Sequence, residues 1–396
     1  MRACNTGQIG EYTMYPDGQA ILYASCFAAM ALHYLGALDG LDARERCAWA
    51  DYIKQWQDPA TGRFLGPELV LEELTSPIHD WEHVTLHLAA HVLPALHVLE
   101  DRPAYRLNFA YRFLNLETLR TWLDQRDWRD AWLEGNNLLF VGQFLLYLRD
   151  YEGRGEAQAA LDVYFDWLDA EQDPVTGLWG TDGYCDAYAA VYGGYHQLLV
   201  YYACNRPVPY AERIIDTTLQ LQHPDGSFTR HGGGGACEDV DAVDILVNLY
   251  KRTGYRPRAV RRALQRALDS VLGQQMPDGG FVYRRGAPFV HMGIARTSTP
   301  ANTSHLFATW FRVHTIALAC QVLLDHPLAE IDWRFNSVCS MGWHNPSSLP
   351  APQPDHWQDR LPVFWYRLEG RLRMLARTEA AACGRLLTFL RKTFAR

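Results

Sequence analysis

The stretch HGGGGACEDVDAVDILVNLY, residues 231–250, joins a glycine-rich turn to a strongly patterned helix. Three aspartates, Asp239, Asp241 and Asp244, stand on the first turns of that helix. Two similar turns bracket the stretch, HPDGSF at 223–228 and MPDGGF at 276–281. The stretch therefore contains the repeating unit of the chain and its best candidate for chemistry.

The turn occurs four times, because QDPATGRFLG at 57–66 and QDPVTGLWG at 172–180 have the same form. Proline fixes φ, Asp or Thr caps the turn, and glycine supplies a positive φ. We expect the aromatic residue that follows to fold back and fill the joint between two helices. A repeat of this kind is typical of a helical array.

Apolar helices alternate with amphipathic ones between these turns. The apolar segments are 19–38, 78–99, 131–151, 185–204, 237–250 and 303–324. The amphipathic segments are 43–55, 103–125, 156–170, 210–221 and 256–275. No strand pattern interrupts them. The alternation predicts an all-α (α/α)6 toroid, with six inner helices inside an outer ring.

The pattern changes after residue 325. We expect one (α/α)6 barrel over residues 1–325 and a C-terminal extension over residues 326–396. The extension reads as an aromatic, irregular segment, a proline-rich strap at 345–361 and a basic amphipathic helix at 365–394 that packs on the barrel.

Composition excludes several classes of protein. Of 396 residues, 48% are hydrophobic, which is enough for a sizeable core. The net charge is −8 and no stripe of basic residues dominates, which argues against a nucleic-acid partner. No apolar run reaches the roughly 18 residues that a membrane-spanning helix needs. Nine cysteines without paired spacing favour a reduced, cytoplasmic protein. The basic C-terminal stretch leaves peripheral membrane contact open.

The PDG(S/G)F turns after glutamine-bearing helices resemble the repeats of the prenyltransferase and squalene–hopene cyclase superfamily. The resemblance covers about residues 14–325 and implies an (α/α)6 barrel. Class II terpene cyclases of this superfamily carry a DxDD motif whose middle Asp is the general acid. Asp239-Val240-Asp241-Ala242 matches its first three positions. The resemblance thus implies a terpene cyclase-like enzyme in which Asp241 starts the cyclisation of an isoprenoid by protonation, without a cofactor.

The residues themselves support a buried acid at this position. Burial and neighbouring carboxylates such as Asp239 keep a carboxylic acid protonated. His305 or His314, from the last apolar helix, could orient Asp241. Aromatic rings on the inner helices could stabilise a cation, and two loop arginines could hold a diphosphate, together with Mg²⁺. These predicted substrate-binding residues are Trp132, Tyr184, Tyr188, Phe307, Trp310, Arg284 and Arg285.

Other interpretations stay open at this point. A zinc-dependent prenyltransferase-like enzyme would use Cys237, Asp239 and His305 as ligands. A non-catalytic toroid would bind a lipid or a partner protein. A sugar-processing toroid enzyme is a smaller alternative, because paired acids and aromatic rings suit carbohydrates. The histidine stripe at 79, 83, 87 and 91 favours a polar face toward a cavity or solvent over a metal site.

Overall fold

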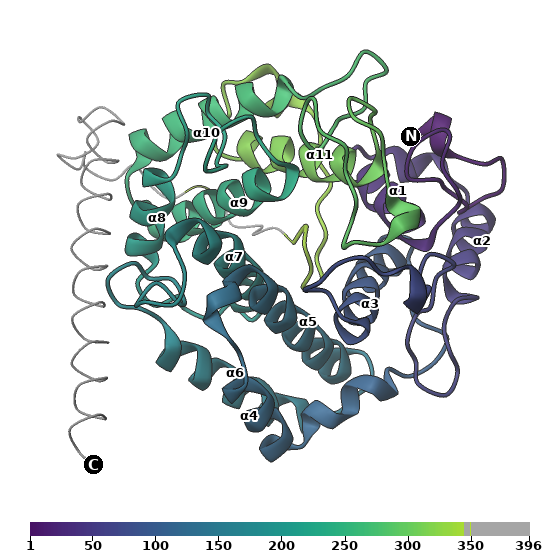
Figure 1. The fold of residues 1–396 in the computed structure, drawn as a ribbon, viewed down its shortest axis with the longest axis horizontal. Coiled ribbons are helices and arrows are strands. Elements are labelled where there is room, and N and C mark those ends of the chain that lie inside the picture. Colours follow the sequence, from purple (N-terminus) through teal and green to yellow (C-terminus); the bar gives the residue numbers. More distant parts are fainter. Residues whose placement is uncertain (344–348, 350–396) are drawn as a thin grey trace.

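The computed structural model describes residues 1–343 and 349. Six inner helices form a ring (Figure 1), and each contacts the next around the ring, with the last closing onto the first. They are α1 (Leu22–Tyr34), α3 (Trp81–Val98), α5 (Ala131–Asp150), α7 (Ala187–Ala203), α9 (Ala236–Thr253) and α11 (Leu306–Cys320). The prediction of an all-α (α/α)6 toroid is confirmed.

Amphipathic helices lie outside this ring, at the periphery of Figure 1. They are α2 (Ala43–Lys54), α4 (Leu116–Asp124), α6 (Ala157–Glu171), α8 (Ala211–Gln220) and α10 (Pro257–Leu272). The segment predicted as one helix over 103–125 is instead a 3-10 helix, η4 (Asn108–Leu114), followed by α4. The helix restarts because the Asn115 side chain accepts a hydrogen bond from Thr118 N at 2.9 Å and caps α4.

Short 3-10 helices occupy several connections: η1 (Arg2–Cys4), η2 (Ala37–Gly40), η3 (Leu71–Glu73), η5 (Trp128–Asp130), η6 (Ala295–Thr297) and η7 (Pro327–Glu330). Within the described ranges the extended backbone forms isolated β-bridges and no strand. None of the helices described is long and apolar enough to cross a membrane. The eight cysteines of this part of the chain are free thiols.

Side-chain caps and small residues decide where the inner helices begin and how closely they pack. Asp80 caps α3 by accepting from His83 N at 2.8 Å, and Asp186 caps α7 in the same way. α5 and α7 pack backbone to backbone. A methyl group at Gly135 would lie 2.3 Å from the carbonyl oxygen of Gly193, so only glycine fits there.

The repeated turn is a joint built around one glutamine. In every copy the glutamine side-chain amide donates to the carbonyl of the turn glycine, whose φ is positive. The four bonds are Gln57–Gly62 at 3.1 Å, Gln172–Gly177 at 2.7 Å, Gln222–Gly226 at 2.9 Å and Gln275–Gly279 at 3.1 Å. The aromatic residues that follow, Phe64, Trp179, Phe228 and Phe281, are buried. The predicted turn chemistry is therefore confirmed.

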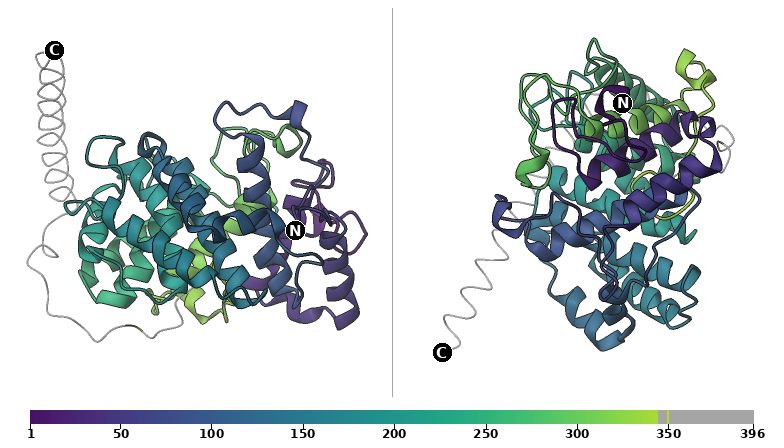
Figure 2. Two further views of the ribbon diagram at one scale, coloured as in Figure 1. Left: turned by 90° about the horizontal axis from the view of Figure 1, so that it is seen from below. Right: turned by 90° about the vertical axis from the view of Figure 1, so that its right-hand side faces the viewer.

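Two loops meet at one end of the ring, and we call residues 286–302 the roof loop. The backbone of Thr75 donates to Gly293 O at 2.9 Å, and Leu74 pairs with Ile294. Arg296 of the roof loop forms an ion pair with Glu73 at 3.0 Å. The two loops project side by side in the left view of Figure 2. Residues that are distant in sequence are thereby brought together at this end of the ring.

Residues 331–343 pack against the inner helices. Tyr34 donates to Gly342 O at 2.9 Å, and Trp343 stacks on Tyr202 with ring centroids 5.8 Å apart. The predicted proline-rich strap at 345–361 and the basic helix at 365–394 lie outside the described residues, apart from Leu349.

Candidate functional site

A cavity of about 240 Å³ lies inside the ring. Helices α3, α5, α7, α9 and α11 and the roof loop all contribute side chains to its wall. Aromatic rings and imidazoles dominate, together with one buried carboxyl and one thiol. The principal lining residues are Trp132, Tyr283, Phe289, Phe307, Phe311, His79, His87, His91, His196, His291, Cys237 and Asp241.

Two acidic residues line this cavity, the half-buried Asp130 and the buried Asp241. Asp241 is the one without water around it. It stands on the second turn of α9 and its residue exposure is 1%. Its Oδ2 has no hydrogen-bond partner within the described chain. Burial raises the pKa of Asp241 well above its ordinary value, and the nearby carboxyls of Glu238, Asp244 and Asp239 raise it further. Asp241 is therefore a neutral carboxylic acid that can donate a hydrogen bond into the cavity.

Two imidazoles of the wall are held in one tautomer. His91 Nδ1 lies 2.8 Å from His87 O, and His196 Nδ1 lies 2.7 Å from Tyr192 O. Because a carbonyl oxygen can only accept, each Nδ1 carries the proton and each Nε2 keeps a lone pair in the neutral ring. Burial lowers the pKa of both histidines to about 4. Near neutral pH both Nε2 atoms are therefore hydrogen-bond acceptors.

His291 enters the cavity from the roof loop. Its ring centroid lies 4.5 Å from that of Phe307, 4.9 Å from that of Tyr23 and 5.1 Å from that of His87. Burial, with the repulsion of neighbouring imidazoles, lowers the pKa of His291 and of His87 well below the ordinary value. The whole imidazole cluster is consequently uncharged near neutral pH.

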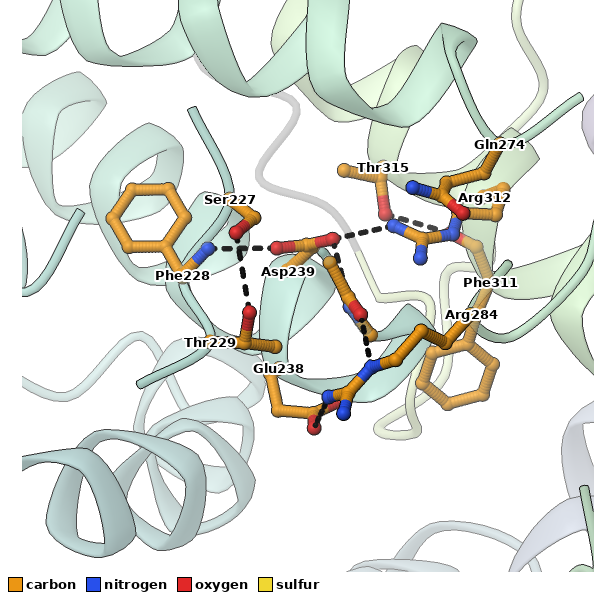
Figure 3. Close-up of polar contacts among 12 residues, drawn as sticks. Ser227, Phe228, Thr229, Glu238, Asp239, Gln274, Arg284, Phe311, Arg312 and Thr315 are labelled. Carbon is orange, nitrogen blue, oxygen red and sulfur yellow. Dashed lines mark hydrogen bonds and ion pairs between the residues drawn. The ribbon is translucent and has the colours of Figure 1, made fainter. Parts of the chain in front are cut away.

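Asp239 has partners that Asp241 lacks, and Figure 3 shows its contacts with Phe228 and Arg312. Its Oδ1 accepts from Phe228 N at 2.8 Å, and its Oδ2 accepts from Gly235 N at 3.2 Å and from the guanidinium of Arg312. Arg312, which is fully buried, also donates to Tyr283 O at 2.8 Å. Asp239 thus ties a repeat turn and the glycine-rich loop to α11. Asp239 therefore stabilises the packing of these segments. Among the groups that raise the pKa of Asp241, it contributes least.

The two predicted histidine partners lie in different environments. His305 caps α11, because its Nδ1 accepts from Ala308 N at 3.3 Å. Its ring stacks on Phe289 at 4.7 Å, and burial lowers its pKa to about 3. His314 lies further along α11 and stacks on Tyr34 at 5.1 Å. Neither residue is among those that line the cavity.

The structure separates the predicted aromatic residues into two groups. Trp132 and Phe307 line the cavity, as expected. Trp310 lies behind its wall, stacked on Phe27 at 5.3 Å. Tyr184 is 57% exposed and Tyr188 lies beneath the guanidinium of Arg230, so neither faces the cavity.

The two predicted diphosphate-binding arginines bind the protein's own backbone. Arg284 Nε donates to Gly234 O at 2.8 Å. Arg285 donates to Gly273 O and to Gln275 O, each at 2.7 Å. These bonds hold the loops together. Neither arginine is among the residues that line the cavity, and the expectation of a diphosphate site with Mg²⁺ stays a prediction.

The alternative zinc ligands are not brought together. Cys237 lines the cavity, Asp239 is clamped by Arg312, and His305 caps a helix. In the described part of the chain, no group of three or more His, Cys, Asp or Glu residues is arranged to hold a metal ion. Burial also raises the pKa of Cys237 well above its ordinary value, which favours the thiol over the thiolate that zinc binds.

Comparison with known proteins finds no matching family model and no matching curated protein. Among solved structures, a polysaccharide lyase matches with 15% identity and a TM-score of 0.44, over 78% of this chain and 90% of that chain. Glycosyl hydrolase family 88 from Bacteroides vulgatus matches with 13% identity and a TM-score of 0.46, over 78% of this chain and 91% of that chain. Similarity at this level carries no inference about the substrate of this chain.

The predicted class II terpene cyclase-like function is corrected, as are its prenyltransferase-like and lipid-binding alternatives. The site supplies a physical reason. Protonation of an alkene needs a strong acid, whereas the raised pKa of Asp241 makes it a weak one. Lone pairs on neutral imidazoles would also capture a carbocation. The predicted isoprenoid and lipid partners are corrected with it.

Sequence reasoning missed two imidazoles of the cavity. His196 follows Tyr192 by four residues on α7, and this helical spacing was a usable signal for a shared face. His291 lies in a long loop, where no periodicity predicts the direction of a side chain. Its position depends on the contacts between the roof loop and residues 67–75.

Proposed function

We propose that the protein is an enzyme that binds a neutral, hydroxyl-bearing ring such as a sugar unit in the central cavity, with Asp241 as its general acid. One observation carries the proposal. The neutral, unpartnered carboxyl of Asp241 faces the same cavity as flat aromatic rings and the imidazole acceptors of His91 and His196. A sugar presents an apolar face for the rings and hydroxyl groups for the acid and the acceptors.

The charge of the wall favours a neutral ligand. The described lining residues include no lysine or arginine. A buried anion such as a phosphate or a uronate needs a cation or several backbone amides to replace its hydration. Hydroxyl groups need only one donor or acceptor each, and the cavity offers both kinds.

The chemistry we propose is acid-assisted cleavage of a C–O bond. Asp241 donates its proton to the oxygen that leaves, which has a lone pair and so requires a much weaker acid than an alkene does. An imidazole Nε2 of His91 or His196 accepts a proton from the incoming water. Aromatic rings of Trp132 and Phe307 hold the ring of the substrate in place.

Ligand binding and turnover by Asp241→Asn test this proposal. We expect neutral oligosaccharides to raise the thermal unfolding temperature, while their uronate counterparts do not. Asp241→Asn should retain binding but lose at least about 100-fold in turnover, because general acid catalysis contributes 10²–10⁴-fold. Asp162→Asn, a change on the exposed face of α6, is the matched control. Full turnover by Asp241→Asn, or binding of anionic sugars alone, would refute the proposal.

The pH profile gives a second test of the same roles. Activity should fall on the alkaline side as pH rises through the raised pKa of Asp241, because the acid then loses its proton. On the acidic side it should fall as pH drops through about 4, where His91 and His196 become protonated. Asp241→Asn should remove the alkaline limb from the residual activity. An unchanged alkaline limb would assign that limb to another group.

A further inference from the structure

His87 of the cavity wall is hydrogen-bonded to a tyrosine of the neighbouring inner helix. The hydroxyl of Tyr23, on α1, lies 2.7 Å from His87 Nδ1. Tyr23 is fully buried, and its backbone N donates to Glu68 Oε1 at 2.9 Å at the start of α1. Its ring meets that of His291 edge-on, with centroids 4.9 Å apart. Tyr23 is therefore held in place both through its backbone and through its ring.

The direction of this bond follows from the acceptors that the hydroxyl can reach. The Tyr23 hydroxyl has one proton, and its other acceptor among the described residues is Val84 O at 3.4 Å, beyond the usual range of an O–H···O bond. If His87 Nδ1 were the donor, the buried hydroxyl proton would be left with that poor contact, at the cost of a lost hydrogen bond. Donation from Tyr23 to Nδ1 leaves neither group unsatisfied. Tyr23 is therefore the donor and His87 Nδ1 the acceptor.

The ring of His87 carries a single proton, and the bond from Tyr23 decides where it is. Burial, together with the repulsion of neighbouring imidazoles, lowers the pKa of His87 well below its ordinary value, so the ring is neutral near neutral pH. Because Nδ1 accepts, the proton is on Nε2. His91 and His196 have the opposite tautomer, since their Nδ1 atoms donate to backbone carbonyls. The cavity wall therefore offers one N–H donor beside two imidazole acceptors.

We propose that Tyr23 is a positioning residue that fixes the tautomer of His87, and that the Nε2–H group of His87 donates a hydrogen bond to a hydroxyl oxygen of the bound ligand. The second part rests on the proposed function, because the hydroxyl belongs to the sugar unit. The rings of His87 and His91 are neighbours, with centroids 4.3 Å apart. A hydroxyl group both accepts and donates, so it suits a donor and an acceptor placed side by side, whereas a carboxylate ion can only accept.

Nitrogen NMR of the full chain without ligand tests the tautomer. Protein labelled with ¹⁵N in its histidines is recorded near neutral pH, where a ring nitrogen with a proton and one with a lone pair resonate far apart. His87→Gln, His91→Gln and His196→Gln each identify one pair of signals by its loss. We expect a protonated Nε2 and an unprotonated Nδ1 for His87, and the reverse for the other two. In Tyr23→Phe, the nitrogens of His87 should move to intermediate, exchange-averaged positions, while those of His91 and His196 stay in place.

Tyr164→Phe is the matched control for the loss of a buried hydroxyl. Tyr164 is also fully buried, and its hydroxyl donates to a backbone carbonyl, Leu138 O, at 3.1 Å. This variant should leave the signals of His87 unchanged. A protonated Nδ1 of His87 in the unaltered protein, or unchanged His87 signals in Tyr23→Phe, would overturn the positioning role. If Tyr23→Phe does not fold, the spectrum of the unaltered protein still decides the tautomer.

The contact with the ligand has a readout of its own. A neutral oligosaccharide that raises the thermal unfolding temperature should move the Nε2–H signal of His87. Tyr23→Phe should weaken its binding by up to roughly tenfold, the contribution of about one hydrogen bond. A bound oligosaccharide that leaves this signal in place would overturn the ligand contact. If no oligosaccharide binds but the tautomer is found, the proposed function fails and the role of Tyr23 stands. If one binds and the tautomer is reversed, this inference fails and the proposed function stands.

Discussion

Asp239 and Asp241 are two residues apart on α9, yet their surroundings give them opposite roles. The buried guanidinium of Arg312 and two backbone amides compensate the charge of Asp239. Asp241 has no such partners, so burial favours its neutral form. A run of aspartates at a helix start therefore contains one structural anion and one candidate acid, and only the packing of α11 distinguishes them.

The buried ion pair leads to a prediction about stability. Arg312→Met leaves the charge of Asp239 buried without a partner, and should lower the free energy of unfolding by about 3–5 kcal/mol. The double variant Asp239→Asn with Arg312→Met should lose less than the sum of the two single changes. Urea unfolding of the four proteins measures this coupling. As a control, Arg129→Met breaks an exposed pair with Asp127 and should lower the free energy of unfolding far less than Arg312→Met does. Additive losses in the double variant would show that the pair is not coupled.

At the scale of the element, the same turn has different surroundings in different repeats. Gly226 and Gly279 occupy the same place in HPDGSF and MPDGGF, and both have positive φ, +92° and +82°. A methyl group at Gly226 would lie 2.2 Å from the carbonyl oxygen of Arg266 on α10, whereas one at Gly279 would meet nothing within 4 Å. Conformation alone requires glycine at the second site, while the packing of α10 adds a steric requirement at the first.

These two glycines form a matched pair for mutagenesis. Gly279→Ala should cost about 1–2 kcal/mol, the ordinary cost of a left-handed backbone for an alanine. Gly226→Ala should cost clearly more, because α10 must move away as well. Thermal unfolding of both variants beside the unaltered protein compares the two losses. Equal losses would mean that α10 adjusts freely at this joint.

At the scale of the whole molecule, ring closure creates the cavity and the roof loop completes it. His291 and Phe289 reach the cavity from a segment that begins more than 30 residues beyond the end of α9. That segment is fastened to residues 67–75 by the Arg296–Glu73 pair and by backbone bonds from Thr75. The cavity wall therefore depends on contacts between distant parts of the chain.

The fastening of the roof loop can be tested by Arg296→Met. Because both partners of the pair are partly exposed, the free energy of unfolding should change very little. Local opening should nevertheless increase, so limited proteolysis should cut within residues 286–302 faster than in the unaltered protein. Arg261→Met, which breaks the surface pair with Asp325, is the matched control. Equal cleavage in both variants would show that backbone bonds alone hold the loop.

The sequence by itself determined the helices, the toroid and the repeated joints, because each depends on local chemistry: helical periodicity, a capping residue, a proline, or a glycine with positive φ. It also placed Asp241 at the start of a buried helix. Tertiary structure alone decided which carboxyl keeps its proton, because the pKa of Asp241 depends on burial, whereas Asp239 is held by Arg312, 73 residues away. It likewise decided that His291 faces the cavity and that Arg284 and Arg285 do not. Charge compensation and loop direction are set by contacts between distant segments, and no local pattern records them.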